Sequence, residues 1–319
     1  MKQLSRVLCV VDPISSEQRA VERAAWVCRK AGAKLDLLIC YFNESLSGAV
    51  IFDAPALDDA RREIMDGHVR RLEDLAKPLR ESGLEVVTKV LWDRPLHEGI
   101  IRYAASIDAN LVFKDTHHHS PVSRAFLSNS DWQLIRTCAS PLWLVKPVPV
   151  SDRPVFLSAI DPMNEHDKPA ALDDEIISCS RMFATLFDGE MHVFHAYDPR
   201  IALESETAIR YMSVPVPYDQ IGEEMRKNHE KRFREITEYY GIEDKRTHLV
   251  AGRTEDALPA LAARLDATVV VMGAIARNRW KRMFIGATAE RTMDHLPCDL
   301  LVVKPDWFHI PDEILKHGE

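Results

Sequence analysis

The chain carries the same strand-and-turn signal at the start of each half, and this duplication constrains its fold more than any other feature. A short apolar run closed by Asp-Pro occurs in residues 6–13 and again in residues 154–162, with the two aspartates 149 residues apart. A second apolar run closed by Lys-Pro ends both halves, in residues 139–147 and 297–305. A chain of 319 residues is long enough for two domains, so we expect two copies of one fold in tandem.

Strands and helices alternate between these signals. In the first half we expect strands at 6–11, 34–41, 85–92, 109–114 and 142–146, and helices at 16–32, 58–83, 95–106 and 131–138. In the second half we expect strands at 155–160, 190–197, 246–251, 268–272 and 300–304, and helices at 172–187, 217–240, 255–265 and 287–295. Such alternation gives parallel strands joined by right-handed crossovers. The predicted class is α/β, with two tandem doubly wound, five-stranded, Rossmann-like domains.

The boundary between the halves falls in a proline-rich linker, K-P-V-P-V-S-D-R-P, at residues 146–154. This predicts a first domain over residues 1–148 and a second over residues 149–319. The tail from residue 308 onward is polar, and we expect it to dock only loosely.

Composition excludes several classes of function. The net charge of −8 and the pI near 5.9 disfavour a general binder of nucleic acid or anionic membranes, which needs a basic face. We find no signal peptide and no apolar run long enough to span a bilayer, so a cytoplasmic location is expected. The six cysteines show no C-x-x-C spacing and are expected to be buried, reduced thiols. We predict no metal site.

A glycine-bounded loop in the second half has the features of an anion site. Gly273 ends a predicted strand, and Gly286 opens the helix that contains Thr288. Glycine lets a ligand approach the backbone, and free N–H groups at a helix start favour an anion. Four cations lie between the glycines: Arg277, Arg279, Lys281 and Arg282. A solvated basic turn is the alternative interpretation.

This loop resembles the nucleotide loop of the universal stress protein family, which reads Gly, two residues, Gly, nine residues, Gly and a small polar residue. Here the pattern falls on Gly273, Ala276, Gly286 and Ala287. The resemblance covers nearly the whole chain, once per half, as in members with two tandem domains. In that family the last strands pair across a twofold axis. We therefore expect residues 142–146 and 300–304 to join the halves as an internal pseudo-dimer.

The resemblance implies that the second domain binds ATP or a related nucleotide. By it, Asp161 would face the adenine, Ala196 would offer its backbone to the base and Gly252 would lie near the ribose. The phosphate path would be lined by Met272, Gly273, Ala276, Gly286, Ala287 and Thr288. Ala276 and Ala287 depart from the family pattern, because the first adds a methyl group to the loop and the second lacks a donor. A retained turn without nucleotide is therefore the alternative.

The first half has lost this pattern. At an offset of 158 residues, Asp115, His118 and Ser128 replace Gly273, Ala276 and Gly286, so we expect no nucleotide there. Three adjacent histidines, residues 117–119, are read as a polar loop rather than a metal site, and Trp92 as a packing residue.

Two histidines of the second half, His192 and His195, lie on one predicted strand and are expected to share a face as half-buried core residues.

Three functions are consistent with these residues. The first is a non-enzymatic stress-response protein that binds a small-molecule ligand, a nucleotide, in the second domain; no general base stands beside the phosphates, so hydrolysis would be slow at most. The second is a nucleotide hydrolase on the same scaffold. The third is a binder of a small metabolite or lipid-like ligand. The sequence leaves open whether two chains form a homodimer and which proteins are partners.

Overall fold

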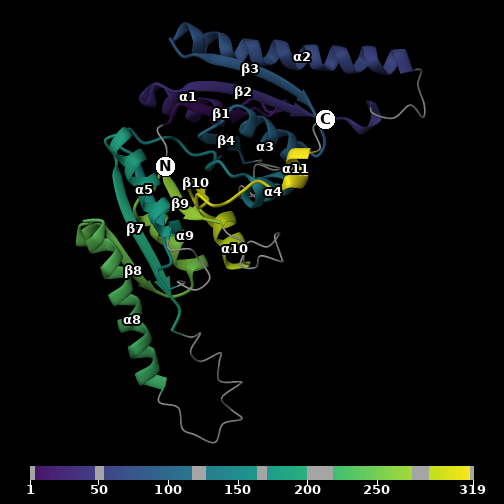
Figure 1. The fold of residues 1–319 in the computed structure, drawn as a ribbon. Helices are drawn as coiled ribbons and strands as arrows, with labels where there is room; N and C mark the ends of the chain where they lie inside the picture. The colour runs from purple at the N-terminus through teal and green to yellow at the C-terminus, as the bar shows by residue number, and fades with distance from the viewer. Residues whose placement is uncertain are drawn as a thin grey trace, which may run out of the picture. The chain divides into compact units, whose positions relative to one another are not determined.

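A computed structural model describes most of the chain as two compact units. It describes residues 4–46, 54–116, 127–163, 171–199, 218–274 and 287–316. One unit comprises Met1–Pro147 together with Trp307–Glu319, and the other comprises Val148–Asp306. Figure 1 shows both units as strands flanked by helices.

The first unit follows the predicted alternation of strands and helices. Its strands are β1 (Arg6–Val10), β2 (Lys34–Tyr41), β3 (Val86–Trp92), β4 (Leu111–Asp115) and β5 (Leu142–Val145). Its helices are α1 (Arg19–Ala31), α2 (Ala54–Glu81), α3 (Leu96–Ser106), α4 (Asn129–Thr137) and α11 (Asp312–Lys316).

The second unit repeats this arrangement. Its strands are β6 (Val155–Ala159), β7 (Glu190–Tyr197), β8 (Thr247–Ala251), β9 (Val269–Gly273) and β10 (Asp299–Val303). Its helices are α5 (Ala171–Leu186), α8 (Tyr218–Tyr239), α9 (Thr254–Arg264) and α10 (Ala287–His295).

Both sheets have the same strand order. In the described residues the first unit runs β3-β2-β1-β4-β5 and the second runs β8-β7-β6-β9-β10, with neighbouring strands parallel in each. The order reverses direction at β1 in one unit and at β6 in the other, which is the doubly wound pattern. The predicted fold class of two tandem five-stranded α/β domains is confirmed. The pairing of the halves through their last strands stays a prediction.

Aromatic and β-branched side chains fill the core of each sheet. In the first unit Phe113 and Trp143 have no exposed surface, and their rings stack with centroids 5.0 Å apart. In the second unit Phe156 of β6 and Phe183 of α5 are equally buried, with centroids 5.8 Å apart. Each such side chain stabilises the folded state by about 1.5–3 kcal/mol relative to an exposed one. The first contact joins the neighbouring strands β4 and β5, and the second fixes α5 on β6.

The six cysteines are all buried, as predicted, and none of them forms a disulfide bond within the described residues. Burial raises the pKa of Cys28, Cys40 and Cys179 to about 12, so these thiols stay protonated at neutral pH. Among the helices described, none is both long and apolar enough to cross a membrane.

The C-terminal tail differs from its expectation, because it packs on the first unit. Helix α11 contacts α3 and buries Ile314, which is 6% exposed. Arg102 of α3 donates to the Ile314 carbonyl oxygen at 2.7 Å, and its guanidinium pairs with Asp93 at 2.6 Å and Glu98 at 3.3 Å. One apolar side chain and one guanidinium thus hold a tail whose composition is otherwise polar. A short polar segment gives no sequence signal for such anchoring.

The anchoring by Ile314 can be tested against its neighbour. We expect Ile314→Asp to release the tail, because the new carboxylate would have to be buried without a partner. Leu315→Asp is the matched control, since Leu315 is 48% exposed on the same helix. Hydrogen exchange of residues 307–316 should accelerate at least about tenfold in the first variant, for a loss of roughly 1.4 kcal/mol or more. Equal protection in both variants would contradict the anchoring.

Candidate functional site

The carboxyl ends of four neighbouring strands bring the predicted ligand contacts of the second unit to one edge. Strands β9, β6, β7 and β8 are consecutive in the sheet and parallel. Asp161 follows β6 and is half-buried, Ala196 is the penultimate residue of β7, and Gly252 follows β8 with φ of +143°. Met272, which is buried, and Gly273 end β9. This is the edge at which doubly wound sheets bind ligands.

The remaining predicted contacts lie at or beyond the limits of the described chain. Ala287 and Thr288 begin α10, as predicted. Ala276, Gly286 and the basic loop residues between them lie outside the described residues. The base end of the predicted site can therefore be described, and its phosphate end stays a prediction.

Gly273 ends its strand in close contact with helix α5. A Cβ atom added at Gly273 would lie 2.4 Å from Leu172 Cδ2 and 2.8 Å from Leu172 Cγ. Leu172 is 1% exposed, so its side chain has little room to move away. Packing against Leu172 therefore favours glycine at this position.

A pair of histidines joins β7 to α8 beside this edge. His195 Nε2 lies 2.7 Å from His229 Nδ1, and His195 Nδ1 lies 3.2 Å from the Ile160 carbonyl oxygen. The His229 ring also contacts the ring of Tyr197, with centroids 5.3 Å apart. His195 is 3% exposed and His229 is half-buried. Burial lowers the pKa of His229, while the Asp161 carboxylate opposes that shift.

A second histidine pair lies on the opposite face of β7. His192 Nδ1 is 3.0 Å from His248 Nε2 of β8, and Glu190 lies 3.5 Å from the other nitrogen of His192. The expectation that His192 and His195 share a face is wrong, because residues three apart on a strand point to opposite sides. Their burial is confirmed.

Sequence reasoning missed His229 and His248. The signal for His229 was available in the helical spacing of Met225, His229 and Phe233, which puts the three residues on one side of α8. His248 could not be paired with His192 without the register between β7 and β8.

In the first unit, carboxylates of the chain itself occupy the helix starts at the equivalent edge. Asp115, at the position of Gly273, accepts a hydrogen bond from the Ala20 backbone N–H at the start of α1, at 2.9 Å. At the start of α4, the Ser128 hydroxyl accepts from Asp131 N–H and the Asp131 carboxylate accepts from Ser128 N–H, at 3.2 and 2.7 Å. Lys114 lies 2.7 Å from the fully buried Asp131. These carboxylates use the donors that would otherwise favour an external anion.

Aromatic side chains fill the outer part of the same edge in the first unit. Trp92 occupies the strand position of Ala251, and its ring packs against Tyr41 and Phe42, with centroids 5.8 and 5.5 Å away. The Arg61 guanidinium covers Trp92 at 4.5 Å from its ring centroid. Trp92 is thus packed within the chain, as predicted.

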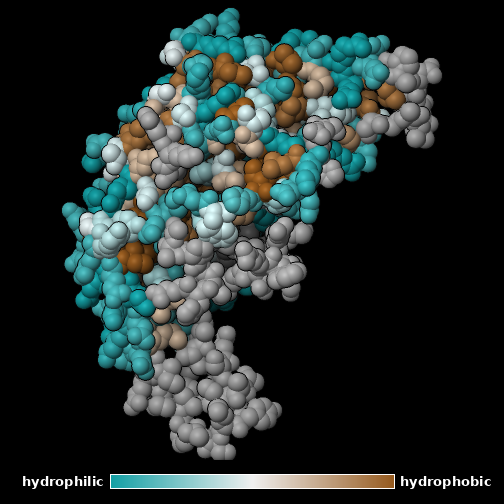
Figure 2. Space-filling model, viewed as in Figure 1, coloured by the Kyte–Doolittle hydropathy of each residue, from teal (hydrophilic) through white to brown (hydrophobic). Residues whose placement is uncertain are grey.

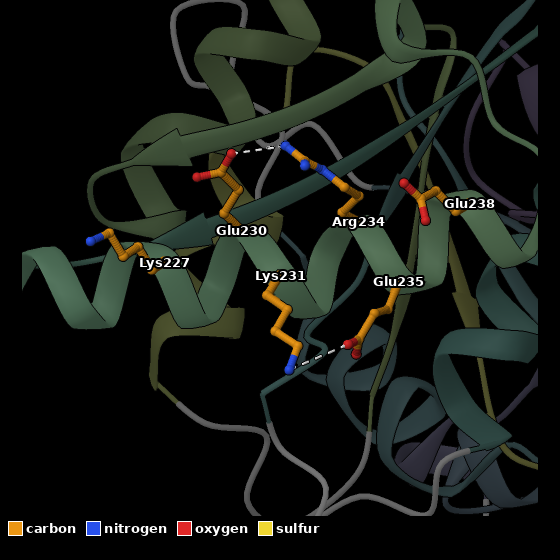
Figure 3. A pocket seen from close by; sticks show the side chains of 6 residues that line it. All are labelled: Lys227, Glu230, Lys231, Arg234, Glu235 and Glu238. Atoms are coloured by element: carbon orange, nitrogen blue, oxygen red, sulfur yellow. Dashed lines mark hydrogen bonds and ion pairs between the residues drawn. The ribbon is translucent and has the colours of Figure 1, made fainter.

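Two surface hollows in the described residues lie away from these edges. Figure 3 shows one along α8, lined only by charged side chains of that helix: Lys227, Glu230, Lys231, Arg234, Glu235 and Glu238. Several of these charged side chains form ion pairs along the helix, such as Arg234–Glu230 at 3.0 Å. Figure 2 shows a hydrophilic surface over α8. The other lies at the amino ends of β7 and β8, with Arg181, Tyr240 and Arg246 in its wall. We interpret the α8 hollow as a solvated helix face.

No group of three or more histidine, cysteine or acidic side chains suited to a metal ion occurs in the described part of the chain. Residues 117–119, the three adjacent histidines, lie outside that part.

The contact between Gly273 and Leu172 gives a stability prediction. We expect Gly273→Ala to lower the free energy of unfolding by about 1–3 kcal/mol, because the added methyl group would press on the buried Leu172 side chain. In a Leu172→Ala background the same substitution should be nearly neutral, since the space is then open. Chemical denaturation of the four proteins of this cycle provides the measurement. An equal loss in both backgrounds would refute the contact.

The histidine pairs give a pH prediction. Burial lowers the pKa of His192 and His229, and burial with the neighbouring His192 lowers the pKa of His248 to about 4. The unfolded chain takes up protons at these groups near pH 6.5, whereas the folded chain does not. The free energy of unfolding should therefore decline as the pH falls from 6.5 towards 4.

Denaturation at pH 7.5 and 5.0 checks this pH prediction, with His248→Gln as the test variant. That variant should lose less stability than the wild type between the two pH values, because one histidine no longer titrates. An unchanged loss would show that His248 does not contribute.

Comparison with known proteins agrees with this architecture over nearly the full length. The sequence model of the Universal stress protein family matches residues 4–146 and 157–304. Universal stress protein E of Escherichia coli strain K12 is 28% identical over 315 residues, covering 98% of each chain, and that of Photorhabdus laumondii is 26% identical over 99% of this chain and 100% of its own.

Solved structures agree as well. A functionally unknown protein from Pseudomonas aeruginosa PAO1 is 27% identical, with a TM-score of 0.70 over 98% of this chain and 95% of its own. A universal stress protein from Archaeoglobus fulgidus shares the fold, with a TM-score of 0.62 at 17% identity over 95% of this chain and 99% of its own. The family match alone covers most of both units. The chain therefore belongs to the universal stress protein family, with two such domains in tandem.

Proposed function

We propose that the protein is a non-enzymatic stress-response protein whose second domain binds ATP or a related adenine nucleotide, while its first domain does not. The observation that carries this proposal is the difference between Gly273 and Asp115 at the same strand end. Glycine adds no side-chain charge at the end of β9, whereas Asp115 brings a carboxylate that already accepts from the Ala20 N–H at the start of α1. Anion binding at a helix start needs free donors, and only the second domain retains the glycine.

The described residues at the base end suit an adenine nucleoside. Asp161 offers a carboxylate acceptor at the switch point of the sheet, and the Tyr197 ring stands at the end of the next strand. Gly252 opens the edge further, because a Cβ atom placed there would meet nothing within 4 Å. An aromatic ring, an acceptor and an open backbone are the elements with which proteins hold a base. The phosphates would be held by the loop that contains Ala276, Gly286, Ala287 and Thr288, in keeping with the family resemblance.

Binding rather than catalysis is the proposed role of the second-domain site. In the described residues the titratable groups beside the edge include the Asp161 and Asp173 carboxylates and two histidines that are hydrogen-bonded to each other. A cytoplasmic location stays a prediction from the sequence, which makes no choice on a homodimer or on protein partners.

Calorimetry with ATP tests this proposal on the full chain. We expect saturable binding of one ATP per chain, weakened by at least about tenfold in Gly273→Asp, because the new carboxylate repels the phosphates as in the first domain. Asp115→Asn is the matched control and should leave affinity and stoichiometry unchanged.

A side chain at position 273 also collides with Leu172, so a second variant keeps the test decisive. Asp161→Ala introduces no bulk and should weaken ATP and adenosine alike. Absence of ATP binding at millimolar concentration, or two sites per chain, would refute the assignment.

A further inference from the structure

Three groups of the second unit form one continuous line of hydrogen bonds: the Ile160 carbonyl, His195 and His229. The two imidazole rings are nearly coplanar, with an interplanar angle of 16°. Their centroids are 5.0 Å apart while the bonded nitrogens are 2.7 Å apart, a difference of about one ring width. The nitrogens therefore face each other along the line between the rings, as in a linear N–H···N hydrogen bond.

The Ile160 carbonyl fixes the tautomers along this line. A carbonyl oxygen only accepts, so His195 must carry its proton on Nδ1. The Nε2 atom of neutral His195 is then an acceptor, and His229 must donate to it from Nδ1. Neutral His229 consequently has its lone pair on Nε2. The sheet backbone thus determines which kind of hydrogen bond His229 can offer to its surroundings.

His229 stands among the groups of the proposed base site. The Asp161 carboxylate acts on it electrostatically, and the Tyr197 ring contacts it. Other charged groups facing this region are Asp173 of α5, which accepts from Asp161 N–H, and Arg226 of α8. Arg226 is held by Glu223 and Glu230 at 2.8 and 2.9 Å. Asp161 is therefore the carboxylate whose charge bears most directly on His229.

The described residues of the first unit hold no such line of hydrogen bonds. There His68 of α2 contacts Tyr41, with centroids 4.6 Å apart, much as His229 contacts Tyr197. The strand position of His195 is occupied by Ile39, which has no hydrogen-bonding group. The histidine–tyrosine contact is common to both copies, and the fixed tautomer belongs to the second alone.

We propose that His229 is a pH-sensitive specificity residue of the second-domain site, which as a neutral imidazole accepts a hydrogen bond from the exocyclic amino group of an aminopurine. This inference rests on the nucleotide-binding function proposed above. Neutral His229 and the Asp161 carboxylate both offer acceptors, a combination that suits an amino group better than a carbonyl oxygen.

Protonation reverses this preference. His229 then carries N–H groups on both nitrogens, so it no longer accepts a hydrogen bond. Its positive charge also attracts the Asp161 carboxylate, and the ligand's amino group loses both acceptors together. Since burial keeps the pKa of His229 below about 6.5, the acceptor state prevails at neutral pH and is lost as the pH falls below that value. A preference for an amino group over a carbonyl should decline over the same range.

Adenosine and inosine are the probes, because they differ at the purine amino or carbonyl group and carry no phosphate charge. Their affinities for the full chain are measured by calorimetry at pH 7.5 and 5.0. We expect the ratio of adenosine to inosine affinity to fall about fivefold or more between these pH values in the wild type. In His229→Gln the ratio should not change with pH. His195→Ile, which copies the first domain, should reduce the ratio at pH 7.5 by releasing the tautomer.

The outcomes separate this inference from the proposed function. Adenosine binding with a ratio that is flat in pH, or equally pH-dependent in His229→Gln, overturns the role of His229 and leaves nucleotide binding standing. Absence of binding of adenosine, inosine and ATP at both pH values overturns the proposed function and this inference with it. A pH-dependent ratio that His229→Gln abolishes supports both.

Discussion

The structure depends on the parallel pairing of strands within each sheet. Parallel strands end at one edge, so residues far apart in sequence, such as Asp161 and Gly252, come to the same edge. The pairing also requires helical crossovers, and the packing of Phe183 against Phe156 shows how a crossover helix is fixed on its sheet. The scaffold sets the place of a site, and the residues at the strand ends set its chemistry.

The two copies show how little sequence is needed to change that chemistry. A glycine at the end of β9 adds no carboxylate at that strand end, whereas Asp115 at the end of β4 supplies one that accepts from the start of α1. The buried pair of Lys114 and Asp131 adds to this in the first copy, because an internal ion pair is costly to open once it has lost its water. In the first domain, carboxylates of the chain thus accept hydrogen bonds at the helix starts. In the second domain, the proposed ligand would supply the anion.

Much of the fold could be predicted from the sequence because it is set by local patterns. Strands β2 and β7 and helix α10 begin and end where the apolar runs and flanking turns indicated. Helix α2 begins at Ala54, four residues before its predicted start, because proline is tolerated in a first helical turn and Pro55 does not stop it.

The features that escaped prediction depend on contacts between distant segments. The hydrogen bond between His195 and His229 joins a strand to a helix 34 residues later, and the docking of α11 joins Ile314 to Arg102 across 212 residues. Neither leaves a periodic signal. The sequence also identified the edge of the second sheet at which the predicted ligand contacts Asp161, Ala196 and Gly252 lie. The side chains at that edge determine which ligand can bind, and binding measurements identify it.

The docking of the tail has a consequence for how the protein is made. Because residues 307–319 belong with the first unit, the second unit is nested between two parts of the first in chain order. Domains emerge from the ribosome from the N-terminus onward, and most can fold as soon as their last strand appears. Here the first domain gains its final helix only after the whole second domain has been synthesised. Completion of the domain made first therefore reports that synthesis of the second domain has finished.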